Sequence, residues 1–193
     1  DPDDLNIDIS KIERAITNRT RMIVPVHYAG SSCDMTYLLQ LAETYKLLIV
    51  EDAAQAYGSK YKGKPLGSIG DFGTLSFHET KNVISGEGGA LLINKRQYNE
   101  KAEIVREKGT NRKKFITGEV DKYTWEDLGS SYLPSELISS FLFAQLKKSQ
   151  FIKSEKLKIW SFYYKLTLEL EKKGYLRRPK IKKECEHNGH IFH

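Results

Sequence analysis

The sequence predicts an α/β fold in which helices cover a mainly parallel sheet. Two uncharged apolar runs, Met22–Val26 and Leu47–Val50, have the length and composition of buried strands. Between them, residues 35–45 repeat apolar side chains at helical spacing. A strand–helix–strand unit of this kind places its two strands in parallel. A third apolar run, Phe72–Phe77, extends the same sheet.

The region before this unit predicts one more helix. Residues 8–17 carry apolar residues on one helical face, and Asp8 or Ser10 is the expected N-cap. After the first strand, residues 27–33 form a loop, and Asp34 caps the helix that follows.

Strands and turns alternate in the middle of the chain. Residues 58–70 are polar and contain several glycines, which predicts a hairpin or a loop. Residues 71–78 form a strand, and a glycine-rich turn at 85–89 leads into another strand at 90–93. Residues 95–108 then form a helix.

The C-terminal half is predicted to be a long loop followed by helices. Residues 109–129 have no apolar period, and loops of this length in a compact domain are usually functional. A helix runs over 134–149, with its cap region at Ser131 or Leu133, and a longer one runs over 152–173.

The composition is that of a globular protein. Hydrophobic residues make up 39% of the 193 residues and charged residues 29%, and no apolar run approaches the length of a membrane span. No basic-then-apolar leader opens the sequence. The two cysteines, Cys33 and Cys185, lie far apart, which is typical of reduced thiols in a cytoplasmic protein.

The net charge of +6 is concentrated towards the end of the chain, where residues 147–183 hold thirteen Lys and Arg against three Glu. Because these basic residues alternate with apolar ones at helical spacing, a solvated helix face is favoured over a nucleic-acid-binding surface. A second group, near the C-terminus, matches the spacing of a zinc site only loosely, so we expect no metal. It consists of Cys185, His187, His190 and His193.

Two side chains at strand ends carry the functional hypothesis. Asp52 follows one apolar strand and Lys81 follows another, and parallel strands bring such ends to one edge of the sheet. Pyridoxal phosphate requires this pair, because a lysine amine forms an imine with its aldehyde and an acid keeps its ring nitrogen protonated. Ala54 leaves space for a flat ring, Gln55 can bond a ring oxygen, and Ser76 can donate to a phosphate.

Each of these residues also has an ordinary structural interpretation. Asp52 can be a cap or part of an ion pair, and Ser76 an in-strand hydroxyl. His78 can be a general base, but a hydrogen-bonded structural histidine is the more common case. The glycine-rich turn at 86–89 is too short for a phosphate-binding loop, and no helix follows it directly.

Several motifs together resemble the DegT/StrS-type sugar-nucleotide aminotransferases. The resemblance covers nearly the whole chain, and part of it points to the members that make dTDP-4-amino-4,6-dideoxygalactose. The motifs are Glu51–Gln55, Gly70–Asp71, Ser76–Asn82, Gly86–Ala90, Val24–Gly30, Arg106–Arg112, Val120–Trp125 and Gly129–Leu133.

The resemblance implies a three-layer α/β/α fold of pyridoxal-phosphate type I and a homodimer with shared active sites. It makes Lys81 the Schiff-base lysine and Asp52 the partner of the pyridine nitrogen. It assigns Gln55 to the phenolic oxygen and Ser76 to the phosphate. Many relatives have an asparagine where this chain has Ser131, and that asparagine reaches the phosphate of the neighbouring subunit's cofactor.

The implied reaction is transamination of a dTDP-4-keto-6-deoxyhexose to the 4-amino-4,6-dideoxy sugar, of galacto configuration, with glutamate as donor, in surface polysaccharide synthesis. Residues 1–145 would be part of the cofactor-binding large domain. Residues 146–193 would be a long helix and the start of a small C-terminal domain. We therefore expect a fragment that lacks both ends of the protein.

Three alternatives remain at this point. A deoxysugar dehydratase on the same scaffold carries histidine where this chain has Lys81, so the lysine argues against it. A regulatory relative could retain the site. A basic nucleic-acid-binding module would use residues 147–183.

Overall fold

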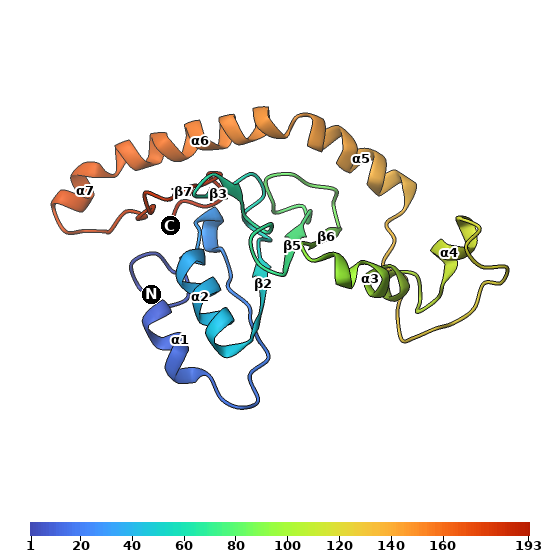
Figure 1. The fold of residues 1–193 in the computed structure, drawn as a ribbon. Helices are drawn as coiled ribbons and strands as arrows, with labels where there is room; N and C mark the ends of the chain where they lie inside the picture. Colours follow the sequence, from blue (N-terminus) through green and yellow to red (C-terminus); the bar gives the residue numbers. More distant parts are fainter.

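The computed structural model describes all 193 residues, and a four-stranded mixed sheet lies at its centre (Figure 1). The strand order is β1-β2-β5-β6, with β1, β2 and β5 parallel and β6 antiparallel to β5. The predicted α/β architecture is confirmed. The strands are β1 Met22–Ile23, β2 Leu48–Asp52, β5 Phe72–Ser76 and β6 Gly89–Ile93.

The register of β2 and β5 decides which side chains share a face. Val50 pairs with Phe72 and Asp52 pairs with Thr74. Because side chains alternate along a strand, Asp52, Thr74 and Ser76 belong to one face of the sheet. Glu51 belongs to the opposite face, where it is fully buried.

Two capped helices cover that opposite face (Figure 1). Helix α1 spans Ile9–Ala15 and helix α2 spans Met35–Tyr45, and the predicted caps Asp8 and Asp34 are both confirmed. The Asp34 carboxylate accepts from the N–H of Tyr37 at 3.1 Å. The core between these helices and the sheet consists of Ile12, Ile23, Cys33, Met35, Leu38, Leu41, Ala42, Ile49, Ala53, Ala56, Tyr61 and Leu66.

The other face of the sheet is open. Met22, Val24, Val26 and Leu91 are 42–52% exposed, although all four are large apolar residues. Only Met22 and Ile23 pair as a strand, so the predicted strand Met22–Val26 is shorter than expected. Pro25 has no N–H to donate to a ladder, and the contact with β2 resumes as a single bridge at Val26.

The hairpin predicted over 58–70 is present and belongs to a second sheet. Strand β3, Lys60–Tyr61, pairs antiparallel with β4, Lys64–Pro65, and on its other side with β7, Cys185–Glu186. The C-terminal segment therefore returns to the middle of the fold. The two cysteines are free and buried, and burial raises the pKa of the Cys33 thiol to about 12.

The region predicted as one helix and one loop contains three short helical segments. A 3-10 turn, η2 Arg96–Tyr98, precedes α3, Asn99–Arg106. Helix α4, Arg112–Ile116, lies inside the predicted loop 109–129, so that prediction is wrong in part. Three of the five residues of α4 are basic, so it carries no apolar stripe to predict it from.

Helices α5, Glu136–Lys147, α6, Ser149–Leu166, and α7, Leu168–Lys172, form a long arch over the rest of the chain (Figure 1). The N-cap of α5 is Ser135, which accepts from Ile138 N at 3.3 Å; Ser131 and Leu133 lie outside the helix. The predicted helix 152–173 begins earlier and is interrupted at Thr167. None of the helices is long and apolar enough to cross a membrane.

The division at residues 145 and 146 into a large and a small domain stays a prediction. This division falls inside α5.

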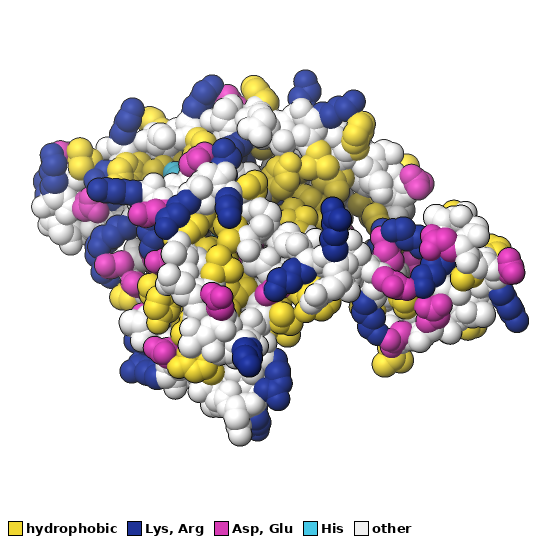
Figure 2. Space-filling model, in the orientation of Figure 1, with side chains coloured by type: hydrophobic (Ala, Val, Ile, Leu, Met, Phe, Trp, Pro, Cys, Tyr) yellow, Lys and Arg dark blue, Asp and Glu magenta, His cyan; other side chains and the backbone are white.

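Hydrophobic side chains gather in a hollow beneath α5 and α6 (Figure 2). Phe141, Phe143 and Phe151 are among the exposed apolar residues of these two helices.

Candidate active site

The ends of β2 and β5 bring most of the predicted site residues together. A small cavity of about 10 Å³ lies at this edge of the sheet. Four of the predicted residues line it: Ala54, Gln55, Ser76 and Lys81. Asp52 ends β2 beside this cavity, on the same sheet face as Ser76. The other lining residues are Tyr57, Asn82, Val83, Asn188 and His190.

Lys81 is presented by a hydrogen-bonded turn between β5 and β6. Its N–H donates to the carbonyl of His78 at 3.0 Å, and the N–H of Glu79 donates to Gly86 at 2.9 Å. The side chain of Lys81 is half-buried and its amine forms no hydrogen bond or ion pair within the chain. The Lys81 amine is therefore available to a ligand in the cavity.

His78 shapes the turn beneath Lys81. Its Nδ1 accepts from the N–H of Thr80 at 3.2 Å and lies 2.9 Å from the hydroxyl of the same residue. Because Nδ1 accepts a backbone hydrogen, the ring proton is on Nε2, which lies 3.6 Å from Glu87. These contacts fit the structural interpretation of His78.

The Asp52 carboxylate has one free oxygen. Its Oδ1 accepts from the N–H of Ala54 at 3.0 Å, and its Oδ2 has no hydrogen-bond partner in the chain. The backbone of Asp52 is fixed on both sides, since its N–H donates to Pro25 at 2.9 Å and its carbonyl accepts from His27 at 3.0 Å. Asp52 is therefore rigid in its backbone and available to a ligand through Oδ2.

The side chains of Gln55 and Ser76 each accept one hydrogen bond within the chain and keep a free donor. Gln55 Oε1 accepts from the N–H of Ala29 at 2.6 Å, which leaves its NH2 group free to donate. Ser76 Oγ accepts from the N–H of His78 at 3.3 Å, which leaves its hydroxyl hydrogen free. Both side chains can therefore donate a hydrogen bond to an oxygen in the cavity.

Ser131 does not lie in this cavity. It is exposed and forms an antiparallel bridge with Glu107, at the end of α3. The neighbouring N–H of Ser130 donates to Val105 at 3.0 Å, so this stretch is attached to α3 and away from the ends of β2 and β5. Within one chain, the structure brings together five of the six predicted residues and leaves Ser131 outside.

A buried His27–Glu51 pair lies behind Asp52, and the sequence prediction missed it. His27 Nε2 and Glu51 Oε2 are 3.0 Å apart, and neither side chain is exposed. His27 Nδ1 accepts from the N–H of Cys33 at 3.2 Å, so Nε2 carries the hydrogen that Glu51 accepts. The sequence signal for this pair is the carboxylate of Glu51, which directly follows the apolar run Leu47–Val50.

The Glu51 carboxylate also holds the loop that precedes β5. It accepts from the backbone N–H groups of Gly67, Ile69 and Gly70 at 2.8, 2.6 and 2.7 Å. Burial alone would raise the pKa of Glu51, but the hydrogen bonds from His27 and from Gly70, Gly67 and Ile69 bring this pKa below its ordinary value. Glu51 is therefore an ionised, fully hydrogen-bonded group inside the core.

The C-terminal segment forms part of the cavity wall through Asn188 and His190. Asn188 is 1% exposed, and its Nδ2 donates to the carbonyls of Gln55 at 2.9 Å and Tyr57 at 3.0 Å. Gly30, with φ +80°, passes so close to Asn188 that a side chain on Gly30 would overlap it. These contacts join residues more than a hundred positions apart, so no local pattern predicts them.

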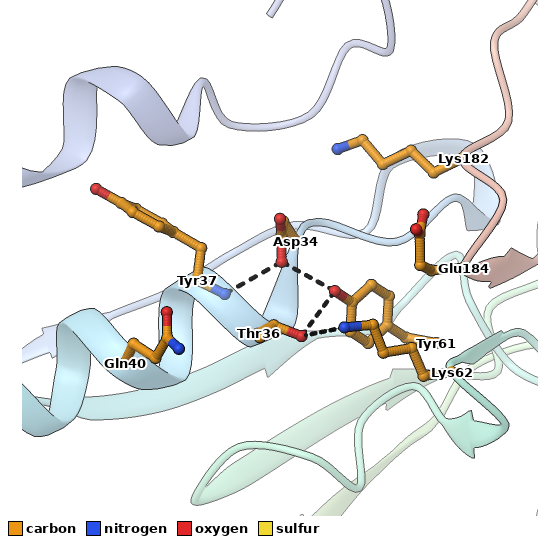
Figure 3. A pocket seen from close by; sticks show the side chains of 8 residues that line it. All are labelled: Asp34, Thr36, Tyr37, Gln40, Tyr61, Lys62, Lys182 and Glu184. Carbon is orange, nitrogen blue, oxygen red and sulfur yellow. Dashed lines mark hydrogen bonds between the residues drawn. The ribbon is translucent and has the colours of Figure 1, made fainter.

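A separate surface hollow lies at the start of α2 (Figure 3). Tyr61 and Lys62 point toward Asp34 and Thr36 there, and Tyr61 donates to Asp34 at 2.9 Å. This hollow contains none of the predicted site residues. Its polar groups cap α2 and attach the β3–β4 hairpin to it.

The whole chain, residues 1–193, matches the family model of the DegT/DnrJ/EryC1/StrS aminotransferases. The chain belongs to this family. Sequence relatives agree with the assignment. A protein of Methanocaldococcus jannaschii, MJ1066, is 37% identical over 195 residues, which is 100% of this chain and 50% of MJ1066.

Two relatives of this DegT/DnrJ/EryC1/StrS chain have names that state a reaction. GDP-perosamine synthase of Caulobacter vibrioides is 36% identical over 148 residues, 77% of this chain and 38% of the synthase. UDP-4-amino-4,6-dideoxy-N-acetyl-beta-L-altrosamine transaminase of Campylobacter jejuni is 33% identical over 192 residues, 98% of this chain and 49% of the transaminase.

Solved structures of aminotransferases have the same fold. The aminotransferase from Psychrobacter cryohalolentis matches with a TM-score of 0.90 and 30% identity, over 98% of this chain and 50% of its own. The PLP-form of a putative sugar aminotransferase from Streptococcus pneumoniae matches with a TM-score of 0.84 and 25% identity, over 100% of this chain and 52% of its own. The predicted type I fold is thereby confirmed. The chain spans about half the length of the relatives it matches.

The residues at the ends of β2 and β5 fit the cofactor of this family, pyridoxal phosphate. The cavity offers an unpaired lysine, a carboxylate oxygen without a partner, and two free donors on Gln55 and Ser76. Its volume of about 10 Å³ is far below the roughly 300 Å³ of a usual ligand pocket.

Proposed function

We propose that the protein containing this chain is a pyridoxal-phosphate-dependent aminotransferase that acts on a keto-sugar nucleotide. The observation that carries this proposal is the convergence of Lys81, Gln55 and Ser76 on one cavity beside Asp52. The cofactor would supply an aldehyde that condenses with amines and a protonated ring that withdraws electrons. Every other step is assigned to side chains of this chain.

Lys81 holds the cofactor and then moves a proton. Its amine has no hydrogen-bond or ion-pair partner in the chain, so it would be free to condense with an aldehyde. Once an amino donor has displaced Lys81, the free amine of Lys81 would take a proton from the donor's α-carbon. It would then give this proton to the carbon that was the cofactor's aldehyde.

Asp52, Gln55 and Ser76 orient the ring. Asp52 Oδ2 is available to accept from the ring nitrogen and to keep it protonated. The NH2 group of Gln55, left free by the bond to Ala29, would donate to the phenolic oxygen, and the free hydroxyl hydrogen of Ser76 would donate to the phosphate. Ala54 leaves space for the flat ring.

The proposed substrate is a dTDP-4-keto-6-deoxyhexose, with glutamate as amino donor and a product of galacto configuration. The motifs Val24–Gly30 and Arg106–Arg112 support this choice, while two of the relatives are named for GDP and UDP sugars. A panel of dTDP, GDP and UDP keto-sugars with glutamate, followed by product identification, discriminates between them. Turnover of the GDP or UDP compound alone would replace the dTDP proposal.

The proposed assembly is a homodimer with shared active sites. The exposed position of Ser131, outside its own chain's cavity, supports a role at the phosphate of the neighbouring subunit. Trp125 and Leu128, at 79% and 87% exposed, offer apolar surface near it. The proposed location is the cytoplasm, where thiols such as Cys33 and Cys185 stay reduced.

A borohydride experiment tests the proposal directly. The full-length protein should bind pyridoxal phosphate with a visible absorbance, and reduction should fix the cofactor to the peptide that contains Lys81. Lys81→Ala should lose both properties, while Lys64→Ala, at an exposed lysine of β4, should keep them. Wild-type turnover by Lys81→Ala would contradict the proposed mechanism.

A further inference from the structure

The segment 187–192 is fixed between α6 and the turn that carries Lys81. Trp160 of α6 donates from Nε1 to the carbonyl of Ile191 at 3.1 Å. The same indole packs against His187, with ring centroids 4.4 Å apart. Helix α6 is thereby attached to one wall of the Lys81 cavity.

Asn82, the residue after Lys81, is held by this segment at both ends of its amide. Its Nδ2 donates to the carbonyl of Asn188 at 3.1 Å, and its Oδ1 lies 3.0 Å from Nδ1 of His190. Because a carbonyl can only accept, Nδ2 must face Asn188 and Oδ1 must face His190. His190 therefore donates from Nδ1, and its Nε2 keeps a lone pair.

His190 lines the cavity that Lys81 lines. Burial and the nearby positive charges of Lys81 and Lys156 lower the pKa of His190 to about 4. The imidazole is therefore uncharged at neutral pH and adds no positive charge beside the Lys81 amine. The charged and hydrogen-bonding groups that face it are Lys81, Asn82 and, from α6, Lys156.

We propose that His190 is a positioning residue that acts through Asn82: it holds the Lys81 turn in place and adds an uncharged acceptor to the wall of the cavity. The proposal rests on the proposed function, because it assigns His190 a part in holding Lys81 for the cofactor. Without the contact, the Asn82 side chain would keep only its hydrogen bond to the carbonyl of Asn188.

Two substitutions of His190 in the full-length protein test the contact. His190→Asn keeps a donor at the position of Nδ1, whereas His190→Leu keeps the bulk and removes the donor. Pyridoxal phosphate binding is titrated by its visible absorbance, and the pH midpoint of that absorbance is measured as well. His190→Leu should bind roughly threefold to tenfold more weakly, as expected for one lost hydrogen bond, with a shifted midpoint. His190→Asn should stay within about twofold.

His187→Leu is the matched control. His187 lies in the same segment and packs on Trp160, but it does not line the cavity. The His187→Leu substitution should change the thermal midpoint of unfolding without changing the pH midpoint of the absorbance. Wild-type behaviour of His190→Leu in both measurements, or an equal change in His187→Leu, overturns the proposal. If His190→Leu does not fold, Asn82→Ala breaks the same contact from the Lys81 side, and the same criteria apply.

The tautomer of His190 separates this proposal from the proposed function. Nitrogen NMR of the cofactor-free protein should report a hydrogen on Nδ1 and a lone pair on Nε2. A hydrogen on Nε2 overturns the positioning role even if the protein binds pyridoxal phosphate. Failure of the wild-type protein to take up the cofactor instead contradicts the proposed function, and the tautomer still tests the contact with Asn82.

Discussion

The side chains of His27 and Glu51 form a pair without exposed surface, with Nε2 and Oε2 3.0 Å apart, directly behind the residue proposed to hold the ring nitrogen. Glu51 and Asp52 are consecutive, yet they face opposite sides of β2. The buried carboxylate attaches β2 to the 67–70 loop, and the next residue is thereby held at the cavity.

Glu51→Gln should destabilise the protein strongly. The substitution removes the charge that accepts four hydrogen bonds, and each hydrogen bond to a charged group is worth about 1.5–3 kcal/mol. Urea denaturation measures the free energy of unfolding. Glu43→Gln, at an exposed position of α2, should change it by less than about 0.5 kcal/mol. A similarly small change for Glu51→Gln would contradict the anchoring role.

The stability of the protein should fall in acid because of Glu51. The pKa of Glu51 in the folded protein lies below its ordinary value of 4.5, so the unfolded chain takes up the proton first. The resulting stabilisation is complete above pH 4.5 and is lost as the pH falls below it. Urea midpoints between pH 6 and pH 3 should show a shallower decline in Glu51→Gln than in the wild type.

His190 should add a separate decline at higher pH. Its pKa in the folded protein is lowered from 6.5 to about 4, so the unfolded chain binds the proton first between these values. Stability from this group is full above pH 6.5 and is lost as the pH falls towards 4. His190→Asn should remove this part of the pH dependence, and an unchanged profile between pH 6.5 and 4 would be the contrary result.

Asp52→Asn should lower turnover of the full-length enzyme by roughly a hundredfold, because a neutral amide holds a protonated ring nitrogen poorly. The free energy of unfolding should change little, since the Asp52 carboxylate accepts only from the N–H of Ala54 within the chain. Asp121→Asn, at an exposed position without an ion pair, is the control and should keep full turnover. Full turnover by Asp52→Asn would remove Asp52 from the mechanism.

Gly73→Ala should destabilise the sheet by about 3 kcal/mol, the upper end of the cost of overpacking. Gly73 pairs with Glu51, and a Cβ on Gly73 would overlap the carbonyl oxygen of Gly67. Gly118→Ala tests the loss of glycine freedom alone, since Gly118 has φ +75° and open space around it. It should cost about 1 kcal/mol. Equal effects of the two substitutions on unfolding would show that the close approach at Gly73 is relaxed.

Local patterns predicted the elements that have local causes. The caps Asp8 and Asp34 and the apolar strand that became β2 were all readable from neighbouring residues. Helix α4 was missed because it is short and mostly basic. The cap of α5 was misplaced because Ser131 and Ser135 are chemically alike, and only Ser135 is followed by helical backbone.

The candidate site was predictable only as far as sheet geometry reaches. Parallel strands bring Asp52 and Ser76 to one edge, so their proximity followed from the strand assignment. Asn188 and His190 reach the same cavity through the return of the chain at β7, which no periodicity signals. Glu51 belongs to the motif Glu51–Gln55, but its burial depends on the 67–70 loop folding over it.

The opposite orientations of Glu51 and Asp52 make β2 intolerant of insertions and deletions. A shift of one residue would turn every side chain of this strand over. The Glu51 carboxylate, which needs four donors, would then face the open side of the sheet. The Asp52 carboxylate, which is proposed to bind a ligand, would be buried without hydrogen-bond donors. Natural variants of this family should therefore change length in the connecting turns and keep the spacing of this strand unchanged.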